Sequence, residues 1–179
     1  MIVELGGQFG QDLWCDVRAG DPFPTHTVAG WGRLLKVDAA GRMLECCAAL
    51  WYQHGIPVMG RCFKDAAGKI QASFGWNGHE YTNAGSFQVL RHHNSKSHGF
   101  EYQWMSYSDL KANTQGWEKV HVSNIAPCIN LTKDGREMLG KIDMFKEVAS
   151  YGEGGKEHVT EGPAVAPYII LVRRDVSTK

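Results

Sequence analysis

The sequence lacks any long apolar run and any excess of charge of one sign. No stretch approaches the roughly 18 consecutive apolar residues that a membrane-spanning helix needs. The first residues, MIVELGG, lack the basic region and apolar core of a secretion signal, so we expect a cytoplasmic protein without a membrane span. Lysine plus arginine and aspartate plus glutamate each number 19, which argues against nucleic acid as a partner.

The motifs of metal sites and disulfide frameworks are also missing. The five cysteines are odd in number and irregular in spacing, with no Cys-x-x-Cys and no Cys/His cluster of zinc-finger spacing: Cys15, Cys46, Cys47, Cys62 and Cys128. We therefore expect reduced, mostly buried thiols, no bound metal and no cofactor. Phosphate-binding glycine loops and nucleophile elbows are absent as well, so no catalytic residue is predicted.

The chain is long enough for one compact unit and too short for two large domains. Its 179 residues are 43% hydrophobic and 21% charged, which is typical of a globular protein. A single domain or two small fused modules are both compatible with this size.

Glycine-rich, alternating patterns favour β structure. There are 21 glycines, and helical periodicity is weak along the whole chain. Residues 42–52 suit a helix by propensity, but we interpret them as a strand. Short alternating or β-branched segments bounded by turn residues predict further strands at 58–63, 70–74, 87–90, 101–104, 120–123 and 168–172.

Two parts of the chain repeat each other. ASFGWNGHE at 72–80 aligns without a gap with ASYGEGGKE at 149–157, and the glycines and the final glutamate coincide. Upstream, HGIPVMGR at 54–61 corresponds to DGREMLGK at 134–141. Further back, Gly30-Trp31 echoes Gly116-Trp117, and both tryptophans are predicted to lie in the core.

The repetition predicts an all-β fold of two internally duplicated antiparallel sheet modules, related by a pseudo-twofold axis and packed like a β-sandwich. We place an N-terminal extension at 1–29 that packs on the core, the first repeat at 30–93 and the second at 116–174. Residues 94–115 are interpreted as a linker and the leading strand of the second repeat, and 175–179 as a tail. The recurrent glycines Gly75 and Gly78 are expected to supply positive φ values.

These motifs resemble the DM-nine repeat family. HGIPVMGR, DAAGKIQASFG and WNGHEY in the first copy, and KDGREMLGK and KEVASYGEGGKEHV in the second, are similar to that family's repeated pattern. Its characterised members are tandem-repeat, all-β proteins, and some are mannose-binding lectins that recognise microbial glycans as dimers. The resemblance implies a lectin-like protein for a neutral hexose such as mannose, with a glycan partner, a possible homodimer and a role in innate recognition.

The resemblance also implies where a sugar would bind. Lys69 matches the family's sugar-binding lysine and Asp65 the acidic residue before it. In the second copy Lys146 takes the lysine position, and Asp134 lies in the loop before the Gly-Lys motif. The alternative is that Asp65 and Lys69 are solvated charges beside a turn.

Other candidate ligand-binding residues lie in the repeated glycine turns. Glu80 and Glu157 occupy equivalent positions, and each follows a basic or titratable residue, His79 or Lys156. Trp76 and Asn77 of the first turn are also candidates, and Trp76 is expected to be exposed. An aromatic face stacks on a sugar ring, which favours Trp76 as a binding residue. The alternative for the glutamates is structural, because a carboxylate can accept N–H bonds from a glycine turn.

Two other functions remain to be weighed against a lectin. A non-catalytic protein-interaction or scaffold module could use the same aromatic-rich surface. A hydrolase using the Cys62 thiol or a His79-Glu80 acid/base pair ranks lowest, because no order or spacing supports either. The histidine-containing segment 92–98 is interpreted as a solvated linker rather than a metal site.

Overall fold

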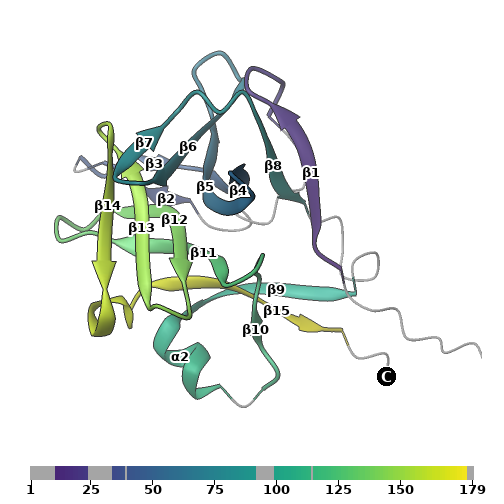
Figure 1. Cartoon of the computed structure of the whole chain (residues 1–179), viewed down its shortest axis with the longest axis vertical. Coiled ribbons are helices and arrows are strands. Elements are labelled where there is room, and N and C mark those ends of the chain that lie inside the picture. Colours follow the sequence, from purple (N-terminus) through teal and green to yellow (C-terminus); the bar gives the residue numbers. More distant parts are fainter. Residues whose placement is uncertain (1–10, 24–33, 39, 92–98, 114, 177–179) are drawn as a thin grey trace, which may run out of the picture.

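A computed structural model describes residues 11–23, 34–38, 40–91, 99–113 and 115–176. Nearly every element is a strand (Figure 1). The described elements of the first half are β1 (Leu13–Arg18), β2 (Leu35–Lys36), β3 (Met43–Leu44), β4 (Cys46–Gln53), β5 (Ile56–Lys64), β6 (Ile70–Trp76), β7 (His79–Tyr81) and β8 (Ser86–Arg91).

The second half adds one short helix and seven strands. The helix begins after Ser106, whose side chain accepts the backbone N–H of Asp109 and so caps the first turn of the helix. The elements are β9 (Phe100–Ser106), α2 (Tyr107–Ala112), β10 (Glu118–Lys119), β11 (Ile125–Leu131), β12 (Glu137–Asp143), β13 (Val148–Glu153), β14 (Lys156–Glu161), the 3-10 turn η1 (Gly162–Val165) and β15 (Ile169–Asp175).

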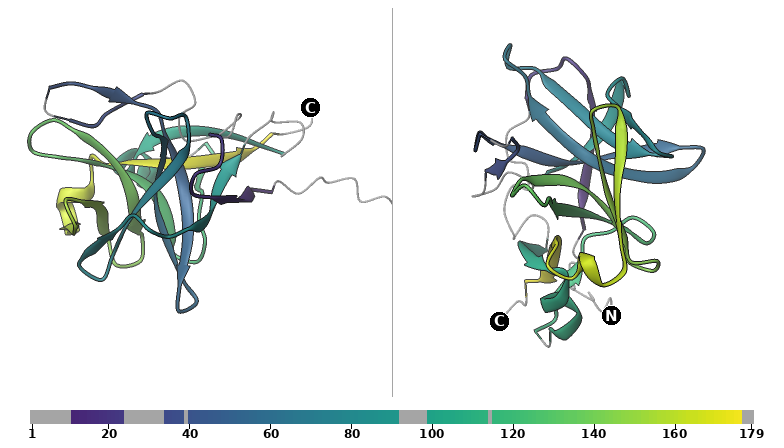
Figure 2. Two further views of the ribbon diagram at one scale, coloured as in Figure 1. Left: turned by 90° about the horizontal axis from the view of Figure 1, so that it is seen from above. Right: turned by 90° about the vertical axis from the view of Figure 1, so that its left-hand side faces the viewer.

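The main sheet is antiparallel and has 13 strands in the order β1-β8-β4-β5-β6-β7-β14-β13-β12-β11-β15-β10, with β9 also paired to β15. It curls on itself, as Figure 2 shows from two further directions. The curl packs β5 against β11 and β12, and β6 against β13, although these strands are not hydrogen-bonded neighbours. The hydrophobic faces of the two halves therefore meet as in a sandwich.

The two halves have the same strand register. Ala49 of β4 pairs with Gly60 of β5, and in the other half Cys128 of β11 pairs with Gly140 of β12. Strand β1 runs beside β8 as β9 runs beside β15. The predicted all-β, antiparallel fold is confirmed, and its two similar halves form one continuous sheet that is joined where β7 pairs with β14, rather than two separate sheets. Residues 43–44 and 46–52, where helix propensity competed, lie in strands β3 and β4.

Glycine turns close the matching hairpins. Asn77 and Gly78 join β6 to β7 with φ values of 51° and 83°, and Gly154 and Gly155 join β13 to β14 with 63° and 82°. Positive φ at both central residues gives the turn the twist of the flanking strands, and Asn-Gly is a strong signal for it. These turns fix the place of the glutamates that follow.

The role of Gly75 differs from the expected positive φ. Gly75 and its partner Gly152 have no left-handed backbone but face each other where β6 crosses β13. A Cβ on Gly75 would lie 2.9 Å from the carbonyl carbon of Tyr151, and one on Gly152 would lie 3.0 Å from the carbonyl oxygen of Phe74. Glycine is needed here for the close approach of two backbones.

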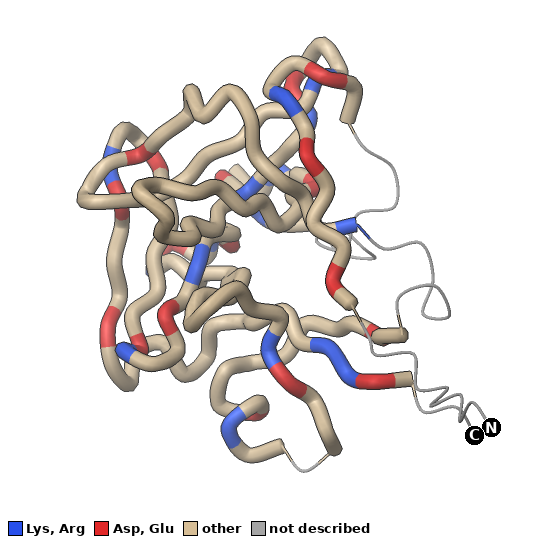
Figure 3. The backbone as a smooth tube through the Cα atoms, turned by 45° about the vertical axis from the view of Figure 1, so that its right-hand side comes forward, with Lys and Arg blue, Asp and Glu red and all other residues tan. Residues whose placement is uncertain are grey.

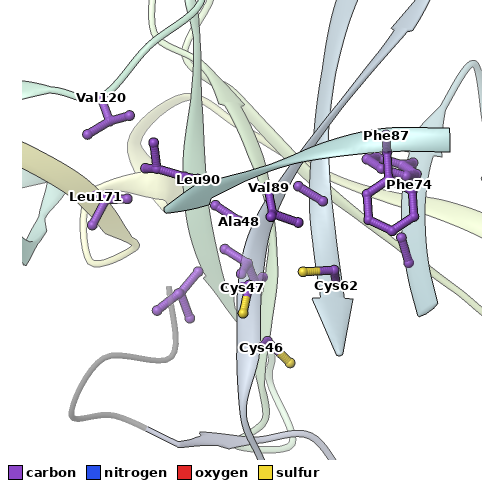
Figure 4. Close-up of a cluster of buried hydrophobic side chains, with 14 of the residues drawn as sticks. Cys46, Cys47, Ala48, Cys62, Phe74, Phe87, Val89, Leu90, Val120 and Leu171 are labelled. Carbon is purple, nitrogen blue, oxygen red and sulfur yellow. The ribbon is translucent and has the colours of Figure 1, made fainter. Parts of the chain in front are cut away.

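The core fills the space between the two halves of the curled sheet. Figure 4 shows a cluster in which Phe74 lies beside Phe87, and Leu90 and Leu171 come from matching strands of the two halves. A smaller cluster around Ile142 lies under α2 and η1. Trp117 packs partly buried against this second cluster, beneath the guanidinium of Arg174; its predicted counterpart Trp31 and the predicted linker 92–98 lie outside the described residues.

Within the part of the chain that the structure describes, no helix has the length and apolar composition needed to cross a membrane.

Gly140→Ala tests the close packing of β12 on β13. The added Cβ would collide with the carbonyl oxygen of Ser150 and lie 2.9 Å from Tyr151 Cα. Because backbone atoms cannot move aside cheaply, we expect the free energy of unfolding to fall by about 2 kcal/mol, measured by urea titration. Val159→Ala, at a half-exposed strand position, should change it by less than about 0.5 kcal/mol. Equal stability of both variants with the parent would contradict this packing.

Candidate functional site

The two repeats are joined by a reciprocal contact between Glu80 and Glu157. The backbone N–H of Glu80 donates to the carbonyl of Gly155 at 3.1 Å, and that of Glu157 donates to Gly78 at 3.1 Å. The side chains repeat the exchange: Glu157 Oε1 accepts the Gly78 N–H at 3.1 Å and Glu80 Oε1 accepts the Gly155 N–H at 3.2 Å. Each glutamate thus satisfies the glycine turn of the other repeat.

A buried serine holds each carboxylate from its own repeat. Ser73 Oγ donates to Glu80 Oε2 at 2.6 Å, and Ser150 Oγ donates to Glu157 Oε2 at 2.8 Å. The serines are among the few polar residues that are fully buried. Their spacing of seven residues from the glutamate is the same in both copies, because each β hairpin places them on adjacent strands.

A cation from the neighbouring strand completes the first half of the junction. Arg61 of β5 lies 3.6 Å from Glu80 and donates from Nη1 to the carbonyl of Gly152 at 2.8 Å, so it binds both repeats. Its side chain is 12% exposed. Burial lowers the pKa of the guanidinium, although the nearby acidic groups oppose this effect.

Lys141 of β12 occupies the matching place in the second half. Its Nζ lies 3.1 Å from Glu157 Oε2 and donates to the carbonyl of Gly75 in the first repeat. Burial lowers the pKa of Lys141 and, taken alone, would raise that of Glu157; the charge of Lys141 and the hydrogen bonds from Ser150 and Gly78 bring the pKa of Glu157 below its usual value. We call these paired groups the repeat junction: Arg61, Ser73, Glu80, Lys141, Ser150 and Glu157.

Four other predicted site residues lie around this junction. His79 pairs with Lys156 where β7 meets β14. Trp76 and His79 both contact the ring of Tyr81, with ring centroids 5.8 and 6.5 Å apart. Asn77 has a left-handed backbone and forms the hairpin turn.

Asp65 and Lys69 lie together in the turn between β5 and β6. Asp65 Oδ1 accepts the N–H groups of Ala67 and Lys69, both at 2.9 Å, and Oδ2 accepts Gln71 Nε2 at 3.0 Å. These hydrogen bonds, that of Gln71 first, lower the pKa of Asp65. The nearest junction residue on β6 is Ser73, four residues beyond Lys69, so about 13 Å of strand separates this turn from the repeat junction.

Asp134 and Lys146 lie in two different turns of the second repeat. Asp134 accepts Thr132 Oγ1 and Arg136 Nε in the turn between β11 and β12. Lys146 lies in the turn between β12 and β13, where its N–H donates to Asp143 Oδ1 at 3.0 Å. The structure therefore distributes the predicted residues over four places: the turn after β5, the repeat junction and these two turns.

Sequence reasoning missed an open cleft of about 710 Å³ between β1, β4 and β8. Strands β4 and β8 pair only at Ala49↔Val89 and Leu50↔Gln88, and beyond that point they separate. The walls carry apolar and charged groups: Asp16, Val17, Arg18, Asp21, Leu50, Trp51, Tyr52, Ser86, Phe87 and Gln88. This mixture of apolar surface and a few polar groups is typical of a binding site.

The aromatic wall of the cleft is where the repeats differ. Trp51 packs against Phe74 and Tyr81, with ring centroids 5.2 and 5.5 Å apart, and Tyr52 beside it is 48% exposed. The strand register places Asn130 of β11 at the position of Trp51. In the sequence, the replacement of Trp51 by Asn130 in the second copy was the signal that could have pointed to this cleft, since the rest of β4 and β11 match in pattern. Acidic and basic residues are interspersed along the backbone of the described chain, as Figure 3 shows.

The cysteines are free thiols, and four of them are buried. Burial raises the pKa of Cys46 to about 12 and raises those of Cys62 and Cys128 well above the ordinary value. A protonated thiol is a poor nucleophile and metal ligand. The described residues also contain no group of three or more His, Cys, Asp or Glu able to hold a metal ion.

Comparison with known proteins gives a consistent assignment. Residues 11–175 match the model of the MFP2b family, described as a cytosolic motility protein. The crystal structure of the nematode sperm cell motility protein MFP2B is 37% identical, with a TM-score of 0.85. That match covers 100% of this chain and 51% of the other, so this chain spans about half the length of that protein. No curated protein matches.

These matches overturn the resemblance to the DM-nine repeat family. Most of the shared motif letters are glycines and turn residues, and here they form hairpins and close backbone contacts that an unrelated β protein can also need. The predictions drawn from that family are therefore wrong: binding of mannose or another neutral hexose, a glycan partner and innate recognition. The description of the matching family as cytosolic confirms the predicted cytoplasmic location.

Glu157→Gln tests the repeat junction. Loss of the charge leaves Lys141 buried without its carboxylate, so we expect the free energy of unfolding at pH 7 to fall by about 2 kcal/mol. Because the pKa of Glu157 is lowered on folding, its contribution is present above pH 4.5 and is lost as the pH falls below that value. Urea titrations of both proteins between pH 7 and 3 should therefore converge at low pH.

Two further variants separate the junction from ordinary surface charge. Glu118→Gln removes the carboxylate from a pair with Arg173 whose glutamate is 56% exposed, and should cost less than about 1 kcal/mol. Combining Lys141→Met with Glu157→Gln should cost less than the sum of the two single changes, because no charge is left unpaired and the side-chain amide still offers an acceptor to the Gly78 N–H and the Ser150 hydroxyl. A double variant at least as unstable as the sum of its single changes would count against this coupling.

The thiols provide a test of burial. With iodoacetamide under native conditions, half-buried Cys15 should react first, while Cys46, Cys62 and Cys128 react at least ~100-fold more slowly until the protein is unfolded. Mass spectrometry of peptides over time measures each rate. Rapid labelling of Cys62 in the folded protein would show that it is an exposed, reactive thiol after all.

Proposed function

The chain belongs to the MFP2b family of cytosolic motility proteins, and we propose that it serves cell movement as a non-catalytic protein-interaction module. The match to that family over residues 11–175 carries the proposal. The solved relative is named as a motility protein of the nematode sperm cell, and we propose the same kind of role for this chain.

The proposed non-catalytic character is supported by what the charged and nucleophilic groups do. Arg61 and Lys141 bind carboxylates and backbone carbonyls across the repeat junction, and both glutamates there accept hydrogen bonds from the opposite repeat. Such groups are committed to holding the fold. Asp65 caps its own turn in the same way.

The cleft between β1, β4 and β8 supports the interaction part of the proposal. A half-exposed tyrosine beside a partly buried tryptophan gives a large contact area at a small cost in side-chain entropy, and such residues carry much of the binding energy at protein interfaces. The acidic side chains of Asp16 and Asp21 at the cleft give it a polar rim.

Replacement of the protein in motile cells tests the proposed function. Cells that normally express it should crawl more slowly when it is removed and recover when the original sequence is restored. Tyr52→Arg places a bulky cation in the cleft wall and should fail to restore the speed, at equal protein level. Crawling speed measured by time-lapse microscopy is the readout.

Ile56→Ala provides the matched control, because Ile56 is 53% exposed on the hairpin that follows Tyr52 but does not line the cleft. This variant should restore movement fully. Normal crawling in cells without the protein would contradict the role in motility. Full rescue by Tyr52→Arg would place the interaction on another surface.

A further inference from the structure

One apolar side chain stands far out of the surface. Phe145, in the turn between β12 and β13, is 82% exposed, whereas the other large hydrophobic residues at the described surface range from 37% to 53%. Single exposed apolar residues are common on proteins and by themselves indicate nothing. The construction of the turn beneath Phe145 makes this residue different.

Hydrogen bonds hold that turn from its first residue. Asp143 Oδ1 accepts the N–H groups of Phe145 and Lys146, each at 3.0 Å. The N–H of Met144 donates to the carbonyl of Asn124 at 3.1 Å. A short carboxylate that bonds to the backbone two and three residues later is a typical way to fix a turn.

The last residue of the turn is anchored to α2. Glu147 has a positive φ of 54°, and its Oε1 accepts Tyr107 Oη and Lys111 Nζ, both at 2.7 Å. The turn therefore cannot readily fold Phe145 back onto the protein. It presents a fixed aromatic side chain with the cation of Lys146 next to it, and we call this pair the knob.

The cleft between β1, β4 and β8 has the complementary chemistry. Trp51, which is partly buried, and Tyr52, which is 48% exposed, offer apolar contact to an aromatic ring, and the volume of about 710 Å³ leaves room for that ring and its neighbours. The lining includes two carboxylates, Asp16 and Asp21, and one guanidinium, Arg18, so these groups together carry one excess negative charge. A basic residue beside an inserted ring suits such a rim.

Knob and cleft belong to different halves of the molecule. In Figure 1 the turn between β12 and β13 lies below β13 near α2, whereas β1 and β8 lie at the upper right. One molecule therefore cannot fill its own cleft. The same arrangement leaves each molecule with one knob and one cleft for its neighbours.

We propose that the occupant of the cleft is a second copy of this chain, whose Phe145 inserts beside Trp51 and Tyr52 while Lys146 faces Asp16 and Asp21. The contact joins two different surfaces, so it can pass from copy to copy, and it ends in a closed ring or an open chain according to the rotation between neighbouring copies. The inference rests on the cleft as the interaction site of the proposed function. It specifies the partner that the function needs.

Sedimentation equilibrium of the 179-residue chain tests the proposal. A contact built on one side chain is small and weak, so the average mass should rise between about 10 µM and 1 mM protein. Phe145→Ala removes the knob and Tyr52→Arg blocks the cleft, and each should weaken association at least ~10-fold. Both positions are exposed, so thermal midpoints should stay close to that of the parent.

Mixing the two variants distinguishes this contact from any other. The Phe145→Ala protein keeps its cleft and the Tyr52→Arg protein keeps its knob, so an equal mixture should form a dimer and stop at two chains. The control Val159→Ala changes a half-exposed residue on β14 and should associate like the parent. No association of the parent at ~1 mM, undiminished association of Phe145→Ala, or a mixture without dimer would each overturn the proposal.

The result can be separated from that of the cell experiment. A chain that remains monomeric, combined with slow crawling of Tyr52→Arg cells, would refute the second copy as occupant and leave the interaction function in place. Association that requires the knob, combined with normal crawling of cells without the protein, would uphold the self-contact and refute the role in movement.

Discussion

The structure depends on one reciprocal contact: each repeat supplies a glutamate that accepts the N–H of the other repeat's glycine turn. Glu80 and Glu157 could not reach these turns unless β6 and β13 crossed closely, and the crossing is possible because Gly75 and Gly152 carry no Cβ. Arg61 and Lys141 then balance the two mostly buried carboxylates, whose side chains are 14% and 12% exposed. A buried charge is costly without such a partner, so glutamate, glycine and cation have to occur together in both copies.

This junction also explains why the binding surface is not symmetric. It fixes the inner strands of both repeats, β5 to β7 and β12 to β14, and leaves the outer strands free to differ. On the outer side Trp51 replaces the buried Asn130 of the other copy, and β4 and β8 separate to form the cleft. In the second repeat, α2 follows β9 directly and anchors the turn that carries Phe145. The inner strands that the two repeats share therefore form the scaffold, and the positions at which the repeats differ form the surfaces that we propose for interaction.

The fold could be predicted from the sequence because its rules are local. Alternating strands, Asn-Gly at 77–78 and Gly-Gly at 154–155 specify hairpins through backbone geometry alone. The nine-residue repeat predicted matching elements, and β6-β7 and β13-β14 match. The cations of the junction were visible only as Gly-Arg and Gly-Lys motifs, because their carboxylates lie across a fold that the linear pattern does not reveal. The cleft depends on where β4 and β8 stop pairing, which no single segment encodes. The family resemblance failed for a related reason: glycine motifs record turns, and turns recur in proteins with unrelated functions.

Native-state hydrogen exchange tests the central claim that the reciprocal glutamate contact makes the two repeats one cooperative unit. Amide groups of β5 and β12 should exchange through the same global opening, and the Gly78 and Gly155 N–H groups should be protected although they lie in turns. Under increasing urea, the exchange free energies of both halves should then fall along one line. Separate lines for the two halves, with unprotected Gly78 and Gly155, would show that the repeats open independently and would contradict the account.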